Sequence, residues 1–242
     1  MMPITLVLLP GMDGAGDLFK PFIQTIGSQY DIQTVRYAPD QAMGYQELIE
    51  FVGKQLPANA PFVLLGESFS GPISVQLAAK PNSNLMGLIL CCTFVRNPQP
   101  VLSWLSPLIN AIPFVKPPIG LLSYLLLGKF STPELELELK SAVNQVAGQV
   151  MKARLNAVLN VDVTAQMAAV KVPILYLQAK YDRLVPSTAS RNIRNANLKT
   201  QVVEIAGPHC LLQAVPAEAA EVVVTFINLI SNNPDTAWVA NA

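Results

Sequence analysis

Ser68 lies in the segment Gly66-Glu67-Ser68-Phe69-Ser70-Gly71, which follows an apolar run and precedes a helical pattern. Small residues around such a serine are typical of a sharp strand-to-helix turn. This turn exposes the hydroxyl at a helix N-terminus, where negative charge is favoured. The usual pattern is G-x-S-x-G, but here Ser70 holds the fifth position and Gly71 comes one residue later. Ser68 is a candidate nucleophile, and a plain turn with a helix-capping serine is the alternative.

His209 is the only histidine, and it directly follows the last predicted strand, while Asp182 follows the strand before it. A serine nucleophile needs a base that titrates near neutral pH, which histidine supplies. An aspartate can accept a hydrogen bond from that histidine and stabilise its imidazolium form. Each residue alone could be an ordinary loop or turn residue. Their positions after strands favour function, because ligand sites in open α/β sheets gather there.

The turn after the first predicted strand, Leu9-Pro-Gly-Met-Asp-Gly-Ala-Gly16, is rich in glycine. It matches neither G-x-G-x-x-G nor a phosphate loop with Gly-Lys-Ser/Thr, which disfavours nucleotide binding. Backbone N–H groups in such a turn can instead stabilise an oxyanion. We expect the N–H groups of Met12 and Phe69 to form this oxyanion hole.

Apolar runs and helical segments alternate along the chain, which predicts an α/β fold with a mostly parallel, six-stranded sheet flanked by helices. The expected strands are Ile4–Leu9, Ile32–Tyr37, Phe62–Gly66, Leu85–Cys91, Ile174–Ala179 and Gln201–Ile205. The expected helices are Leu18–Gln29, Tyr45–Gln55, Phe69–Lys80, Ser187–Asn195 and Ala217–Ile230.

The alternation is interrupted over residues 96–169, which we interpret as a helical cap inserted into a core of residues 1–95 and 170–231. Ser131-Thr-Pro-Glu134 indicates a helix start with a capping box. Lys152 and Arg154 are expected on a solvated helix face, with contact to an anionic group as the alternative. The small, polar residues 232–242 are expected to be loosely held.

Apolar side chains of the cap are candidate contacts for an acyl chain, because ligand pockets are mostly apolar. The named candidates are Trp104, Leu105, Leu122 and Tyr124. Packing within the cap itself is the alternative role for these residues. Prolines interrupt the apolar run 101–128, which argues against a spanning helix and leaves peripheral lipid contact open.

The charge and hydrophobic content of the chain argue against several classes of protein. The formal net charge is zero, 51% of residues are hydrophobic and 13% are charged. This balance argues against a disordered chain and against a nucleic-acid partner. The three cysteines show neither a disulfide framework nor metal-ligand spacing, so we expect no metal and a reducing, cytoplasmic location. Oligomeric state is not predicted.

The order Ser68, Asp182, His209, with each residue after a strand, resembles the α/β-hydrolase superfamily of serine esterases and lipases. The resemblance also includes two short segments around the acid and the histidine, Tyr181-Asp-Arg-Leu-Val-Pro186 and Gly207-Pro-His209. Pro10-Gly11 stands where many relatives have His-Gly.

The resemblance implies an acyl-enzyme on Ser68, with His209 as base then acid, Asp182 as its orienting partner and no cofactor. It therefore predicts hydrolysis of a small-molecule carboxylic ester, with a medium or long acyl chain favoured. Two alternatives use the same triad. One is acyl transfer to an alcohol, and the other is a ligand-binding protein with slow turnover.

Overall fold

The computed structural model describes residues 4–100 and 117–232. Its six strands form one sheet in the order β2-β1-β3-β4-β5-β6, and every neighbouring pair is parallel. This confirms the predicted fold class. The strands are β1 Thr5–Leu9, β2 Asp31–Thr34, β3 Phe62–Glu67, β4 Leu85–Cys91, β5 Ile174–Ala179 and β6 Thr200–Ile205.

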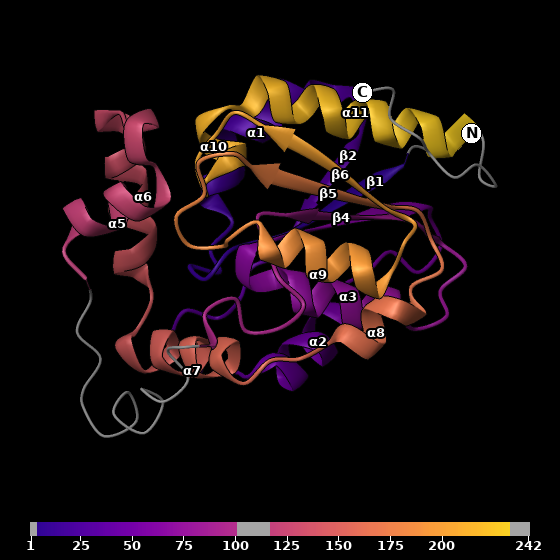
Figure 1. Ribbon diagram of the computed structural model, residues 1–242, viewed down its shortest axis with the longest axis horizontal. Coiled ribbons are helices and arrows are strands. Elements are labelled where there is room, and N and C mark those ends of the chain that lie inside the picture. Colours follow the sequence, from indigo (N-terminus) through magenta and orange to yellow (C-terminus); the bar gives the residue numbers. More distant parts are fainter. Residues whose placement is uncertain (1–3, 101–116, 233–242) are drawn as a thin grey trace.

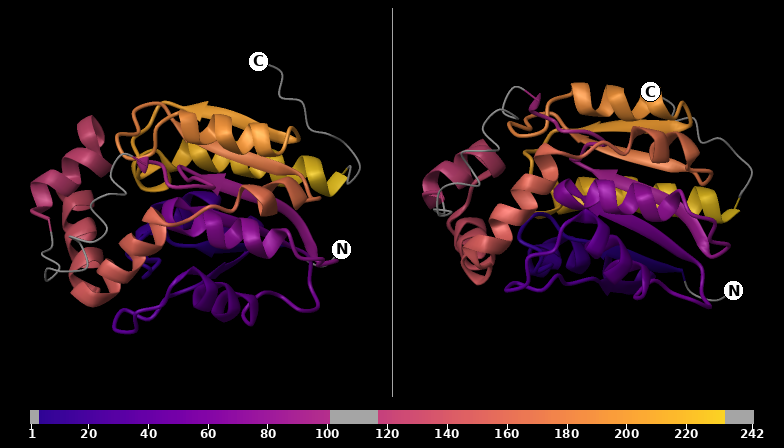
Figure 2. Two further views of the ribbon diagram at one scale, coloured as in Figure 1. Left: turned by 60° about the horizontal axis from the view of Figure 1, so that its bottom comes forward. Right: turned by 90° about the horizontal axis from the view of Figure 1, so that it is seen from below.

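Helices cover both faces of the sheet (Figure 1). One face carries α1 Lys20–Ile26, α10 Leu211–Ala214 and α11 Pro216–Asn232. The other face carries α2 Tyr45–Gly53, α3 Gly71–Ala78, α8 Thr164–Ala169 and α9 Thr188–Ala196. Two further views show the same layering (Figure 2).

Each face of the sheet has its own apolar core, because successive side chains of a strand point to opposite faces. In β3, Phe62 and Leu64 belong to the core under α2, α3 and α9, whereas Val63 and Leu65 belong to the core under α1 and α11. Strands buried on both sides need apolar residues at every position. This explains why β1, β3 and β4 are nearly continuous apolar runs, whereas the edge strands β2 and β6 also carry polar residues.

The strand order of the sheet indicates where a ligand would bind. β1 lies between β2 and β3, so the connections leave β1 and β3 toward opposite sides of the sheet. In open α/β sheets, ligands bind in the crevice at the carboxyl ends of strands flanking such a reversal. The loop after β1 and the turn after β3 therefore meet at this edge.

Part of the inserted segment forms helices beyond the carboxyl ends of the strands, at the left of Figure 1. These are α5 Ile119–Leu126, α6 Pro133–Gln145 and α7 Gly148–Leu159. The predicted capping box at the start of α6 is wrong in part. The predicted box pairs Ser131 with Glu134, but Thr132 is the N-cap residue instead, and its hydroxyl accepts from the Leu135 N–H at 3.3 Å. The division into core and cap, and the loose tail, stay predictions.

Two element boundaries differ from the prediction for local reasons. β2 ends at Thr34 instead of Tyr37, because the Tyr37 N–H leaves the sheet and donates to the Gly14 carbonyl at 2.8 Å. The first predicted helix is broken at Gly27, which has φ of 66°. Within the described ranges, no helix combines the length and apolar character needed to cross a membrane.

Candidate active site

Ser68 sits at a strained turn between β3 and α3. Its φ is 49°, a left-handed value that non-glycine residues adopt at a cost. The turn is compact because glycines flank it. A Cβ on Gly66 would lie 2.2 Å from Ser74 Oγ, and one on Gly71 would lie 1.9 Å from Thr93 Oγ1. The turn therefore needs glycine at positions 66 and 71.

Ser70, the departure from the usual motif, has a specific place in this turn. Its side chain is fully buried, and its hydroxyl donates to the Pro10 carbonyl. The Tyr37 hydroxyl lies 2.7 Å from Ser70 Oγ and is left to act as the donor there. A glycine could make neither contact. Ser70 thus links the turn that carries Ser68 to the loop after β1.

The structure brings Ser68, His209 and Asp182 together, although 141 residues separate the first two. His209 Nε2 lies 2.9 Å from Ser68 Oγ, and His209 Nδ1 lies 2.8 Å from Asp182 Oδ2. The other oxygen of Asp182, Oδ1, accepts the N–H groups of Leu184 and Val185 at 2.8 and 2.9 Å. The carboxylate is thereby fixed toward the imidazole.

The His209–Asp182 pair is shielded from water, with side-chain exposures of 6% and 5%. Burial alone would lower the pKa of His209. The negative charge of Asp182, its hydrogen bond and the charge of Glu67 outweigh burial, and together they raise the pKa above its ordinary value. An imidazole so placed accepts a proton from Ser68 and is stabilised once it is charged.

The loop after β1 carries Met12, the predicted oxyanion donor. Gly11 and Gly14 close this loop through the Gly14 N–H and the Gly11 carbonyl, 3.1 Å apart. Phe69 is the second residue of the 3₁₀ turn Ser68–Ser70, and N–H groups in the first turn of a helix have no acceptor within it. Among the described residues, the Met12 N–H also has no hydrogen-bond acceptor. The role of both N–H groups as an oxyanion hole stays a prediction.

Arg154 is not on a solvated face, and that prediction is wrong. The residue is 1% exposed, and its guanidinium donates to the Met12, Asp13 and Ala38 carbonyls at 2.8, 3.0 and 3.2 Å. The sequence held a signal for this position. Val150, Arg154 and Val158 are spaced four residues apart on α7, so the arginine continues a buried stripe of the helix.

Sequence reasoning also missed Glu67, the residue before the nucleophile. It is 7% exposed, and its carboxylate accepts from the Gln213 amide at 3.1 Å. Loss of hydration raises the pKa of Glu67 to about 7, and the nearby Asp13 adds to the rise. A lone acid ending an otherwise apolar strand was the signal available in the sequence.

The inserted helices contact the loops that carry the acid and the base. The Cys210 N–H, next to His209, donates to the Leu126 carbonyl at 3.0 Å. The Arg183 guanidinium, next to Asp182, donates to the Tyr124 carbonyl and stacks 4.0 Å from the Tyr124 ring. α5 is thus joined to both loops.

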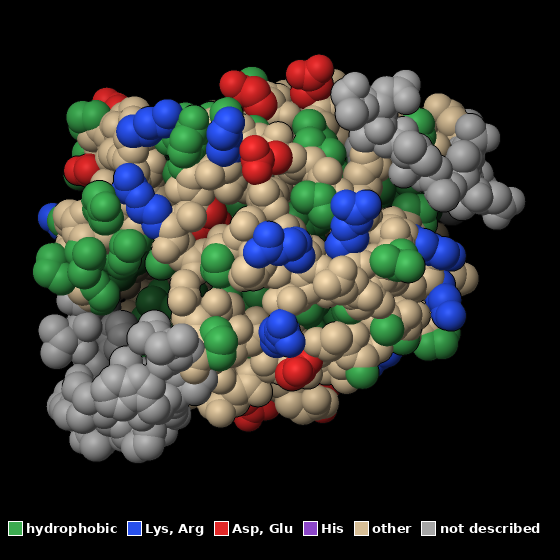
Figure 3. Space-filling model, in the orientation of Figure 1, with side chains coloured by type: hydrophobic (Ala, Val, Ile, Leu, Met, Phe, Trp, Pro, Cys, Tyr) green, Lys and Arg blue, Asp and Glu red, His purple; other side chains and the backbone are tan. Residues whose placement is uncertain are grey.

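The predicted acyl-chain contacts are only partly placed. Trp104 and Leu105 lie outside the described residues. Leu122 lines a small hollow of about 180 Å³ with Lys140, and Tyr124 is 59% exposed. Apolar side chains gather over α5 and α6 (Figure 3), including exposed Leu121 and Leu137. Peripheral lipid contact stays a prediction.

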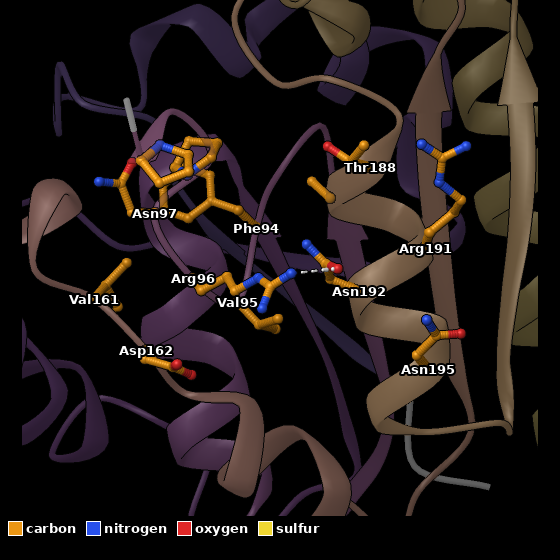
Figure 4. Close-up of a pocket in the computed structure, with 13 residues that line it drawn as sticks. Phe94, Val95, Arg96, Asn97, Val161, Asp162, Thr188, Arg191, Asn192 and Asn195 are labelled. Atoms are coloured by element: carbon orange, nitrogen blue, oxygen red, sulfur yellow. Dashed lines mark hydrogen bonds between the residues drawn. The ribbon is translucent and has the colours of Figure 1, made fainter. Parts of the chain in front are cut away.

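A larger cavity of about 630 Å³ lies between α9 and the segment after β4 (Figure 4). Arg96 donates to Asn192 within it at 2.8 Å. None of Ser68, Asp182 and His209 lines this cavity. It is separate from the candidate active site.

The fold and the arrangement of these three residues define an α/β hydrolase. Residues 36–209 match the family described as serine aminopeptidase, S33, and the chain belongs to that family.

Solved structures share this fold at low sequence identity. A hydrolase from Oleispira antarctica is 16% identical, with 93% of this chain and 91% of that chain covered and a TM-score of 0.79. A thermophilic esterase from Thermogutta terrifontis is 17% identical, with coverage of 94% and 90% and a TM-score of 0.78. A carboxylesterase structure from Nitrososphaera gargenis has a TM-score of 0.81 at 13% identity, covering 96% and 92%.

One curated relative is also similar. Phytyl ester synthase 1, a chloroplastic protein of Arabidopsis thaliana, is 29% identical over 119 residues. The match covers 45% of this chain and 16% of that protein. This chain therefore corresponds to a small part of the plant protein.

Proposed function

We propose that this protein is a serine hydrolase that cleaves carboxylic esters through a Ser68 acyl-enzyme. The observation that carries the proposal is the His209 ring, which lies within hydrogen-bond distance of Ser68 Oγ on one side and of Asp182 on the other. A buried imidazole with these two partners is suited to move a proton between the serine and a leaving group.

In the proposed reaction, Ser68 Oγ attacks the ester carbonyl carbon while His209 Nε2 takes the hydroxyl proton. The carbonyl electron pair moves onto oxygen, where the N–H groups of Met12 and Phe69 stabilise the charge. Collapse expels the alcohol, which His209 protonates. A water molecule, deprotonated by His209, then attacks the acyl-enzyme and releases the acid and Ser68.

A medium or long acyl chain is the proposed substrate feature. α5 lies beyond the carboxyl ends of the strands and is apolar except at Ser123, and its carbonyls contact the loops of His209 and Asp182. An apolar helix in contact with the loops of the acid and the base suits an acyl tail. The three cysteines are free thiols, which supports the cytoplasm as the proposed location.

Acyl transfer to an alcohol is the second candidate. It needs the same acyl-enzyme, with an alcohol in place of water in the second half of the reaction. The similarity to an enzyme named for synthesising phytyl esters supports this candidate, because that name implies ester formation. A long-chain alcohol is the acceptor that it suggests.

We expect the protein to hydrolyse p-nitrophenyl esters, with kcat/KM rising from the acetyl ester toward the octanoyl or longer esters. Release of p-nitrophenol measures total turnover, and chromatography of the products with and without a long-chain alcohol separates hydrolysis from transfer. A fluorophosphonate should label Ser68, as located by peptide mass spectrometry. Labelling at another serine, or neither labelling nor turnover, would contradict the proposal. Labelling of Ser68 together with very slow ester turnover would favour a ligand-binding protein.

The acidic limb of the kcat/KM profile should move to lower pH in Glu67→Gln. The negative charge of Glu67, whose own pKa is about 7, makes the smallest of the contributions that raise the pKa of His209, so removing that charge lowers slightly the pH at which His209 becomes an active base. The amide keeps a partner for Gln213. Glu204→Gln, the same change at an exposed position of β6, should leave the limb in place. If the acidic limb of Glu67→Gln stays at the wild-type pH, the charge of Glu67 does not affect the pKa of His209.

A further inference from the structure

Arg154 is a buried cation whose hydrogen bonds go to carbonyl oxygens rather than to a carboxylate. Within the described part of the chain it forms no salt bridge, and its three hydrogen bonds go to the carbonyls of Met12, Asp13 and Ala38. Its guanidinium carbon also lies 5.6 Å from the centre of the Tyr37 ring. Burying a charge is costly unless it is fully hydrogen-bonded, so this arrangement indicates a specific role.

Two of these three carbonyls belong to the loop that carries Met12. The guanidinium packs directly against that loop, because a Cβ on Gly14 would lie 2.7 Å from Arg154 Nη1. The third carbonyl, from Ala38, belongs to the segment whose Tyr37 N–H donates to Gly14. The planar guanidinium of Arg154 thus joins the Met12 loop to the segment that follows β2.

The same loop is held from the opposite end by the nucleophile turn. The Ser70 hydroxyl donates to Pro10, two residues before Met12. Between these two attachments, the Met12 N–H has no acceptor among the described residues. The loop is therefore fixed on both sides of the Met12 N–H, and an oxyanion hole requires a donor held in place in this way.

A direct role for Arg154 in binding substrate does not fit its surroundings. The side chain is 1% exposed, and three carbonyls and the Tyr37 ring occupy its faces. An anionic headgroup has no route to it. Its influence on the reaction therefore passes through the loop.

We infer that Arg154 is a positioning residue of the inserted segment, which sets the Met12 N–H in the geometry that stabilises the oxyanion. This inference rests on the proposed function. Its physical reason is that a misplaced donor still allows substrate to bind but stabilises the transition state less. Arg154 should therefore affect kcat and the binding of tetrahedral analogues more than KM.

The test compares Arg154→Lys, Arg154→Met and, as a control, Arg194→Met, which removes a charge from an exposed position of α9. Lysine keeps the charge but cannot span three carbonyls, because its ammonium is a compact donor rather than a planar fork. Active sites are counted by fluorophosphonate titration, so that loss of folded protein does not enter kcat. An alkyl boronic acid, which forms a tetrahedral adduct with a catalytic serine, reports on the oxyanion hole.

We expect kcat of Arg154→Lys to fall about 10- to 100-fold, with boronate affinity falling in parallel and KM changing little. Arg194→Met should match the wild type. Unchanged kcat and boronate affinity per active site in Arg154→Lys would overturn the inference while leaving the proposed function intact. A loss confined to the number of active sites or the melting temperature would also overturn it, because it shows a purely structural role. A wild-type protein with neither ester turnover nor a boronate adduct would overturn both.

Discussion

Ser68→Ala should reduce kcat/KM for p-nitrophenyl esters by about 10³- to 10⁶-fold, because no other group can form the acyl-enzyme. Alanine keeps the Cβ of serine, so the backbone at φ of 49° experiences the same strain in both proteins. The measurement is the initial rate at equal protein concentration, with circular dichroism to compare folding. Ser28→Ala, which removes an exposed hydroxyl far from β3, should retain the full rate.

Variants of His209 and Asp182 test whether the three residues act as one unit. His209→Gln and Asp182→Asn should also lose most activity. Combining either with Ser68→Ala should cost little more, because groups that act as a unit are not additive. A Ser68→Ala protein that keeps the wild-type rate would remove Ser68 from the mechanism. Residual activity that disappears on further purification would point instead to a contaminating esterase.

Gly71→Ala should lower the free energy of unfolding by about 3 kcal/mol, the upper part of the range for overpacking a well-packed core. The added methyl would lie 1.9 Å from Thr93 Oγ1 and 2.7 Å from Thr93 Cβ. Thr93 cannot easily yield, since it is fully buried and its hydroxyl donates to the Ser68 carbonyl. Urea unfolding measures the change. The shift should also reach the nucleophile and lower kcat.

The matched control is Gly120→Ala in α5, where a Cβ would meet nothing within 4 Å. That change should be neutral or should stabilise by up to about 1 kcal/mol, since alanine favours a helix more than glycine does. Adding Thr93→Ala to Gly71→Ala removes the two closest atoms and should restore part of the stability. Equal stability of Gly71→Ala and Gly120→Ala would show that the turn adapts to a side chain at position 71.

The sequence predicted that Ser68, Asp182 and His209 lie together, because each of them follows a strand, and the structure confirms their proximity. The strands of a parallel sheet end at one edge, so Ser68, Asp182 and His209 converge there whatever the loops between them do. The same logic placed Met12, which follows β1. Local patterns therefore predicted the part of the site that depends on strand ends.

The parts that sequence reasoning missed depend on where the inserted helices lie. Nothing local indicates that Arg154 meets carbonyls more than 100 residues away. Its place in a buried stripe predicts burial, but not its partners. Ser70 was predicted only to be small, although its hydroxyl links two loops. Ser131 and Glu134 fit a capping box, yet Thr132 is the N-cap residue. Ser131 donates to Glu136 together with Ser123 of α5, because tertiary contacts override a local motif.

The attachment of the inserted helices has a consequence for protein engineering. The helices contact the Met12 loop through Arg154, the His209 loop through the Leu126 carbonyl and the Asp182 loop through the Tyr124 carbonyl. Chimeras that exchange this segment between relatives would sever all three attachments at once. We therefore expect such chimeras to keep activity when Arg154, its carbonyl partners and the α5 contacts are exchanged together. Recombination could then alter the substrate range.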